Sequence, residues 1–181
     1  MTSANHVSGT DRIAEVIGLK GFKPDEVIVN VQGDEPFIDP LLIKQVANAL
    51  YETRASAATL CYPIDSYEQF INPNVVKVVR NHLDEALYFS RAPIPVHRDN
   101  PLSIEGTFRH LGLYAYRASL VSAFVNWPIA LSESYEALEM LRILYQGHSI
   151  VVKKAVVAPM QDINTKEDLD AALAYVASGV E

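Results

Sequence analysis

Two adjacent carboxylates, Asp34 and Glu35, end an apolar run within residues 27–36, Val-Ile-Val-Asn-Val-Gln-Gly-Asp-Glu-Pro. The run is rich in β-branched residues, which predicts a buried strand at residues 27–31. Gly33 lets the chain turn there or approach a ligand closely. Ligands of open α/β sheets bind at the carboxyl ends of strands, and carboxylates there suit Mg²⁺ with a phosphate. The alternative is a strand-to-helix turn with a solvated acidic pair.

A turn of small residues, Ser-Gly-Thr-Asp-Arg at positions 8–12, precedes a helical pattern. Backbone N–H groups at such a helix start can hold an anion or the edge of a base. The alternative is an ordinary N-cap, a position that serine favours.

Arg91 stands at the end of a strand-like run, directly after Ser90 and before two prolines. An arginine at a strand end can hold a carboxylate or a phosphate through two parallel hydrogen bonds. A surface ion pair explains the same residue equally well, so the sequence leaves both interpretations open.

Polar and aromatic residues alternate with apolar ones over residues 109–117, so His110, Gly112, Tyr114 and Tyr116 share one face of a predicted strand. That face is too polar for a dry core and suits the wall of a pocket for a polyhydroxylated substrate. A single histidine is more often structural, but the two tyrosines and the glycine beside it favour a site.

Glu136, Glu139 and Arg142 are spaced at i, i+3 and i+6 of one predicted helix. This spacing is typical of a solvated ladder of ion pairs on a helix surface.

Strand and helix patterns alternate along the chain and must position these residues. We expect strands at 27–31, 57–62, 75–79, 86–90, 110–116 and 150–157, and helices at 11–17, from 39, at 119–125, at 132–147 and after a capping box at 165–168. The alternation predicts one α/β domain, residues 1–181, with a mixed, mostly parallel central sheet flanked by helices.

The composition excludes several classes of protein. The formal net charge of −7 argues against a broad nucleic-acid surface, although a local group of cations could still hold a small anion. Cys61, the single cysteine, lies in an apolar run and is expected to be a buried thiol, which fits a reducing, cytoplasmic setting. No apolar run is long enough to cross a membrane, and the N-terminal residues are too polar for a signal peptide.

Five motifs occur along the chain in a defined order. They lie at 6–12 (His-x-Ser-Gly-Thr-Asp-Arg), 30–36 (Asn-Val-Gln-Gly-Asp-Glu-Pro), 72–79, 86–95 and 109–117 (Arg-His-Leu-Gly-x-Tyr-x-Tyr-Arg). Together they resemble the 3-deoxy-manno-octulosonate cytidylyltransferase family of Gram-negative lipopolysaccharide synthesis, over nearly the whole chain. The resemblance implies a nucleotide-diphospho-sugar transferase-like fold.

The same resemblance implies a reaction. That family joins CTP and 3-deoxy-manno-octulosonate (Kdo) with Mg²⁺, giving CMP-Kdo and pyrophosphate, and its members are homodimers. By resemblance Asp34 holds the metal and, with Arg91, serves catalysis, while Ser8 and Gly9 lie near the cytosine. The residues expected on the Kdo side are Gln32, Arg91, His110, Tyr114 and Glu139.

Three positions depart from the family pattern. No counterpart of the family's basic triphosphate loop is present, so about 60–80 residues would precede Met1 in a typical member. Asn164 stands where the family has a second metal-binding Asp, and Asp162 is a candidate substitute. Met140 stands where the family has a glutamine.

The departures leave three hypotheses open. The chain is a weakly active or inactive portion of such an enzyme, or a degenerate homologue that keeps the sugar pocket and the dimer surface. The third is another sugar nucleotidyltransferase or a metal-dependent glycosyltransferase, against which the motif at 109–114 argues.

Overall fold

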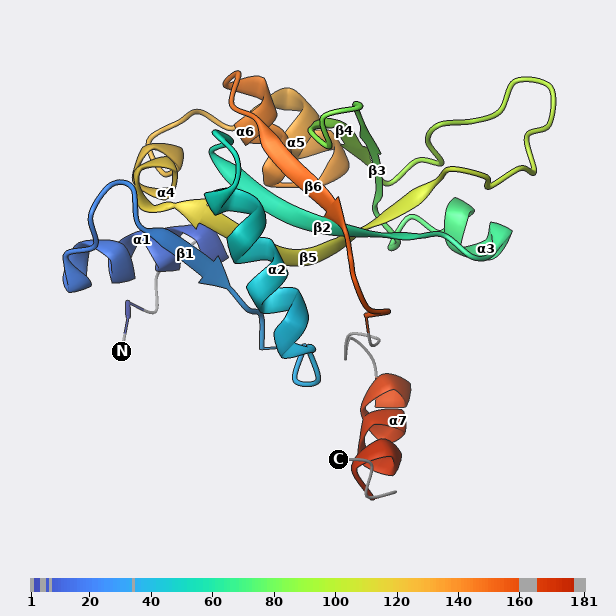
Figure 1. Ribbon diagram of the computed structural model, residues 1–181, viewed down its shortest axis with the longest axis horizontal. Coiled ribbons are helices and arrows are strands. Elements are labelled where there is room, and N and C mark those ends of the chain that lie inside the picture. The colour runs from blue at the N-terminus through green and yellow to red at the C-terminus, as the bar shows by residue number, and fades with distance from the viewer. Residues whose placement is uncertain (1, 4–5, 7, 34, 160–165, 178–181) are drawn as a thin grey trace.

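A computed structural model describes residues 2–3, 6, 8–33, 35–159 and 166–177 of the chain. A single mixed sheet lies at its centre, with helices on both of its faces (Figure 1). The described strands are β1 (Val27–Asn30), β2 (Ala57–Pro63), β3 (Lys77–Arg80), β4 (Ala86–Ser90), β5 (Phe108–Arg117) and β6 (Ile150–Lys154). The described helices are α1 (Gly9–Lys20), α2 (Pro40–Tyr51), α3 (Tyr67–Ile71), α4 (Ala118–Phe124), α5 (Leu131–Glu136), α6 (Met140–Tyr145) and α7 (Lys166–Ala177).

β5 is the strand around which the sheet is organised. The strand order is β4-β3-β5-β2-β6, and β1 also pairs with β5. β2 follows β5 along one edge. The other edge is shared, because Lys77 of β3 pairs with Arg109 near the start of β5 and Val27 of β1 pairs with Arg117 at its end.

The mixed α/β class is confirmed, but the balance of pairing differs from the mostly parallel sheet that the sequence predicted. Among the described strands only β2 and β6 pair in parallel, and the four other pairings are antiparallel. β1, β2, β3 and β6 still point the same way. β5 runs in the opposite direction. β1, β2 and β3 all pair with β5, so these three pairings are antiparallel.

Each face of the sheet is covered by its own hydrophobic layer. α2 packs on one face through Leu42, Val46 and Leu50, which join Leu60 of β2 and Leu113 of β5. On the other face α1, α4 and α6 cover the residues of β5 that alternate with Leu113, including Tyr114 and Tyr116. The predicted alternation along β5 is therefore confirmed.

Several helix boundaries differ from the sequence prediction. α1 continues through Gly18 to Lys20 and is capped by Gly21, whose φ of 68° is the left-handed conformation typical of a helix C-terminus. The single helix expected at 132–147 is wrong: the chain breaks it at Ala137, with φ of 51°, into α5 and α6. α3 was not expected, and the capping box at 165–168 begins outside the described residues.

No helix in the described part of the chain is both long and apolar enough to cross a membrane.

Candidate active site

A cavity of about 470 Å³ opens on the face of the sheet covered by α1, α4 and α6. Its wall is built from the start of α1, the carboxyl end of β1, the end of β5, one side of α4, and the α5–α6 turn with α6. Four of the residues predicted for the site line it: Gly9, Gln32, Tyr114 and Glu139. These residues are far apart in sequence, and the fold brings them to one space.

The start of α1 is fixed by a reciprocal capping box. The backbone N–H of Asp11 donates to Ser8 Oγ at 3.2 Å, and the backbone N–H of Ser8 donates to Asp11 Oδ2 at 3.1 Å. The N-cap interpretation of this turn is therefore confirmed. The cap also holds Gly9 and Thr10 at the cavity wall, at the positive end of the helix dipole.

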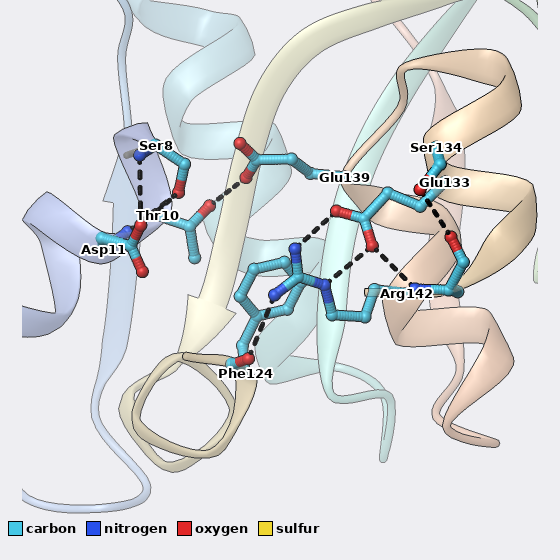
Figure 2. Close-up of polar contacts among 9 residues, drawn as sticks. Ser8, Thr10, Asp11, Phe124, Glu133, Ser134, Glu139 and Arg142 are labelled. Carbon is cyan, nitrogen blue, oxygen red and sulfur yellow. Dashed lines mark hydrogen bonds and ion pairs between the residues drawn. The ribbon is translucent and has the colours of Figure 1, made fainter. Parts of the chain in front are cut away.

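Glu139 crosses the cavity rim to reach α1. Its Oε2 accepts a hydrogen bond of 2.6 Å from Thr10 Oγ1, as Figure 2 shows. Glu139 is the residue that precedes α6, so this contact ties the start of α6 to the first turn of α1. The spacing of Thr10 and Glu139 in the sequence gives no sign of this contact.

The ladder of ion pairs expected from Glu136, Glu139 and Arg142 is not formed, and that prediction is wrong. Arg142 instead makes two hydrogen bonds to the carboxylate of Glu133, Nε to Oε2 at 2.8 Å and Nη2 to Oε1 at 2.5 Å (Figure 2). The guanidinium also lies over the ring of Phe124, 4.2 Å from its centroid. The break at Ala137 changes the helical spacing, so the three residues no longer share one helix face.

Gly112 leaves room for the chain that follows β1. Gln32 Nε2 donates to the carbonyl of Gly112 at 3.3 Å. A Cβ at position 112 would already touch Gln32 Nε2 and Glu35 Oε1, each at 3.4 Å. The glycine of the predicted substrate-facing strand thus brings the segment after β1 against β5.

Tyr114 presents a buried polar group at the cavity wall. The residue is 6 % exposed, and its hydroxyl makes no well-formed hydrogen bond among the described residues, although it approaches the hydroxyl of Thr59. Burial raises its pKa well above the usual range, so the hydroxyl keeps its proton and remains a donor. Its ring stacks on that of Tyr116, with centroids 5.3 Å apart. A buried donor without a well-formed hydrogen bond at a cavity wall is suited to a ligand acceptor.

His110 lies next to Tyr114 and outside the residues that line the cavity, with ring centroids 5.2 Å apart. Burial lowers its pKa to about 3, so the imidazole is neutral near pH 7. Its Nε2 is 3.1 Å from the hydroxyl of Thr59, a fully buried residue of β2. Sequence reasoning missed Thr59, although a hydroxyl inside the apolar run Ala-Ala-Thr-Leu-Cys signals a buried hydrogen bond.

Arg91 does not line the cavity, and its guanidinium is directed at main-chain carbonyls. Nε donates to Glu136 O at 2.6 Å, Nη1 to Pro73 O at 3.0 Å and Nη2 to Ala137 O at 3.3 Å. The carboxylate of Glu136 in turn accepts from Ser90 Oγ and from the backbone N–H of Arg91. Arg91 thus anchors the α5–α6 turn, which contributes Ala137 and Glu139 to the cavity.

Lys77 holds the backbone of Arg91 in place. It is fully buried, and its ammonium donates to the carbonyls of Asn72 at 2.9 Å and Arg91 at 2.6 Å. The pKa of Lys77 is lowered, mainly because burial removes water from its ammonium group. Sequence reasoning did not single out this lysine, although it interrupts the apolar run Val-Val-Lys-Val-Val.

All three predicted metal ligands, Asp34, Asp162 and Asn164, lie outside the described residues. Within the described residues no group of three His, Cys, Asp or Glu side chains could hold a metal ion. Gln32 and Gly33, which precede Asp34 in the chain, line the cavity.

The sequence and the fold of the chain have counterparts among known proteins. Residues 1–153 match the family model described as Cytidylyltransferase. The chain is 58 % identical over 175 residues to a 3-deoxy-manno-octulosonate cytidylyltransferase of Legionella pneumophila (strain Lens), covering 97 % of this chain and 70 % of the relative. It is 49 % identical to the protein of that name from Psychrobacter arcticus, over 94 % of this chain and 68 % of the relative.

A solved structure agrees with the sequence relatives. CMP:2-keto-3-deoxy-manno-octonic acid synthetase complexed with CTP superposes with a TM-score of 0.89 at 34 % identity, covering 99 % of this chain and 72 % of that one. This match confirms the nucleotide-diphospho-sugar transferase-like fold. The chain belongs to the cytidylyltransferase family, together with relatives named 3-deoxy-manno-octulosonate cytidylyltransferase.

Proposed function

We propose that the chain serves the transfer of a cytidylyl group from CTP to Kdo, giving CMP-Kdo and pyrophosphate. The observation that carries this proposal is the cavity, where Gly9, Gln32, Tyr114 and Glu139 converge, and where the buried hydroxyl of Tyr114 makes no well-formed hydrogen bond to a described residue. The resemblance assigns all four to substrate, and relatives with the corresponding name support the choice of substrates.

The cavity wall offers groups suited to a polyhydroxylated acid. Tyr114 remains protonated and donates to a sugar oxygen, while the carboxylate of Glu139 accepts from a sugar hydroxyl. The amide of Gln32 offers both a donor and an acceptor. Leu120 and Phe124 form an apolar side that excludes water and strengthens these hydrogen bonds.

The start of α1 is the candidate base side of the cavity. Ser8 is held by its capping box, and Gly9 lets a planar ring approach the first turn of the helix. A Cβ atom at position 9 would meet no other atom within 4 Å, so the space beside Gly9 is open.

Mg²⁺ is the proposed cofactor, held by Asp34 with Asp162 or Asn164. These side chains offer only oxygen donors, the ligands that a hard cation prefers, so the set fits the ion. The bound ion would neutralise phosphate charge while pyrophosphate leaves. We further propose that the protein is a homodimer, as the family resemblance implies. A cytoplasmic location is also proposed, since the single cysteine, Cys61, is a buried free thiol.

The direct test is pyrophosphate release from CTP and Kdo with Mg²⁺, measured on this chain and on Asp34→Asn. We expect release by this chain that the substitution abolishes. A second measurement follows Kdo binding by calorimetry, with Tyr114→Phe weakening it about tenfold because the substitution removes one buried donor. Kdo binding that is absent from the unaltered chain would overturn the proposal.

A second candidate function is a non-catalytic homologue that keeps the sugar pocket. Met140 favours it, because this residue lines the cavity where the family has a glutamine. This alternative would be selected if the chain binds Kdo but releases no pyrophosphate, and if release is still absent after Met140→Gln and Asn164→Asp.

A further inference from the structure

We propose that Thr59 is a positioning residue of the active site, whose hydroxyl holds His110 in the tautomer that carries its proton on Nε2. The assignment concerns the site of the proposed function. It rests on that proposed function and on the way β2 pairs with β5.

Thr59 lies where the pairing of β2 with β5 is irregular. Thr59 is opposite Tyr114, but the next residue of β2 is opposite Leu111, so Gly112 and Leu113 have no counterpart on β2. The hydroxyl of Thr59 spans this bulge, since its Oγ1 is 3.0 Å from the carbonyl oxygen of Leu111 and 2.9 Å from that of Leu113. The side chain is fully buried, so no solvent replaces these contacts.

The number of protons around Thr59 determines the direction of each hydrogen bond. A hydroxyl has one proton, and carbonyl oxygens only accept, so the proton of Thr59 is directed to the carbonyls of the bulge. If it were directed to His110, two carbonyl oxygens would lie within 3.0 Å of a hydroxyl oxygen with no hydrogen between them. Besides the Tyr114 hydroxyl, which also approaches Thr59, the remaining contact is 3.1 Å to His110 Nε2, and the imidazole must donate it.

This tautomer leaves Nδ1 of His110 with a lone pair. No described residue hydrogen-bonds Nδ1, and the ring is held in place by Phe89 and Tyr114, whose centroids each lie 5.2 Å from its own. The neighbouring pair thus combines an acceptor, His110 Nδ1, with a donor, the hydroxyl of Tyr114, which is the member of the pair that lines the cavity. A sugar hydroxyl both donates and accepts, so this combination suits the proposed substrate.

The first measurement is the tautomer itself, by two-bond ¹H–¹⁵N correlation on the imidazole of His110 in the 181-residue chain without ligand. We expect Nε2 to carry the proton. A proton on Nδ1 would overturn the proposal without any variant being made. The result is independent of catalysis, so it stands apart from the outcome of the pyrophosphate assay.

Two variants then separate positioning from packing. Thr59→Val keeps the branched shape but has no hydroxyl, whereas Thr59→Ser keeps the hydroxyl and removes a methyl group. We expect Thr59→Val to lose the fixed tautomer and to weaken Kdo binding about tenfold, while Thr59→Ser stays within about threefold of the unaltered chain. An unchanged tautomer in Thr59→Val, or equal loss in both variants, would contradict the assignment.

Discussion

The hydroxyl of Thr10 on α1 donates a hydrogen bond of 2.6 Å to the carboxylate of Glu139, 129 positions later in the chain. This contact joins the first turn of α1 to the start of α6 across the cavity rim. Both residues line the cavity, so the contact that stabilises the fold is also part of the candidate site.

Removing the hydroxyl of Thr10 tests this contact. Thr10→Val should lower the free energy of unfolding by about 1 kcal/mol, because a partly buried hydrogen bond to a carboxylate is lost. Thr10→Ser is the matched control and should retain most of the stability. Urea unfolding measures both variants, and equal stability of Thr10→Val and the unaltered chain would show that the contact contributes nothing.

The ion pair of Glu133 and Arg142 should be costly to break on one side only. Arg142→Met leaves a carboxylate that is 7 % exposed without its cation, and we expect a loss of about 3 kcal/mol. The double variant Glu133→Leu, Arg142→Met removes both charges and should recover most of that loss. A double variant as unstable as the single one would assign the loss to packing over Phe124 and not to the unpaired charge.

His110 predicts how stability depends on pH. Its pKa is about 3 in the folded chain, compared with an ordinary value of 6.5. Between these values the unfolded chain binds a proton that the folded chain does not, so the free energy of unfolding falls as the pH drops below about 6.5. The contribution is fully present above that pH.

The matched variant for this prediction is His110→Gln. Between pH 7 and pH 5 the unaltered chain should lose about 2 kcal/mol more than the variant, because each pH unit corresponds to about 1.4 kcal/mol. Urea titrations at the two pH values give the difference. Parallel losses in both proteins would mean that His110 titrates normally in the folded chain.

Substitution of Arg91 should lower the stability of the fold, because this residue anchors the main chain and does not line the cavity. Its guanidinium donates to three main-chain carbonyls, so Arg91→Met should lower the free energy of unfolding by about 2 kcal/mol, and Arg91→Lys should restore only part of it. If Arg91 held substrate directly, Arg91→Met would instead leave stability unchanged and abolish Kdo binding.

The strands were predictable from the sequence because their apolar runs are β-branched and bounded by turn residues. The paired arrangement was not, since no local pattern tells that β5 will lie between β2 and β3. The prediction of a single helix at 132–147 was wrong for a related reason. Glu133, Glu136 and Glu139 each bind a partner from a different part of the fold, and these contacts outweigh the helical periodicity at Ala137.

The candidate site was predicted unevenly. Motif resemblance selected Gly9, Gln32, Tyr114 and Glu139, and the structure brings all four to one cavity. Thr59 was missed because its importance depends on the carbonyls of another strand, which are the same chemical group at every position of the chain. The residues next to Thr59 in the sequence do not indicate the bulge between β2 and β5 that the Thr59 hydroxyl spans.

The shared edge of β5 also affects the order in which the protein can assemble during synthesis. β1 pairs with β5 alone, Val27 opposite Arg117, and β2 waits for β5 and for the still later β6. Until β5, which begins at Phe108, has left the ribosome, only the β3–β4 hairpin can form among the described strand pairs. Such distant pairings slow folding and leave strand edges exposed to other nascent chains. The β3–β4 hairpin and α2 are thus the segments that can fold early, and the cavity is completed only after both edges of β5 are occupied.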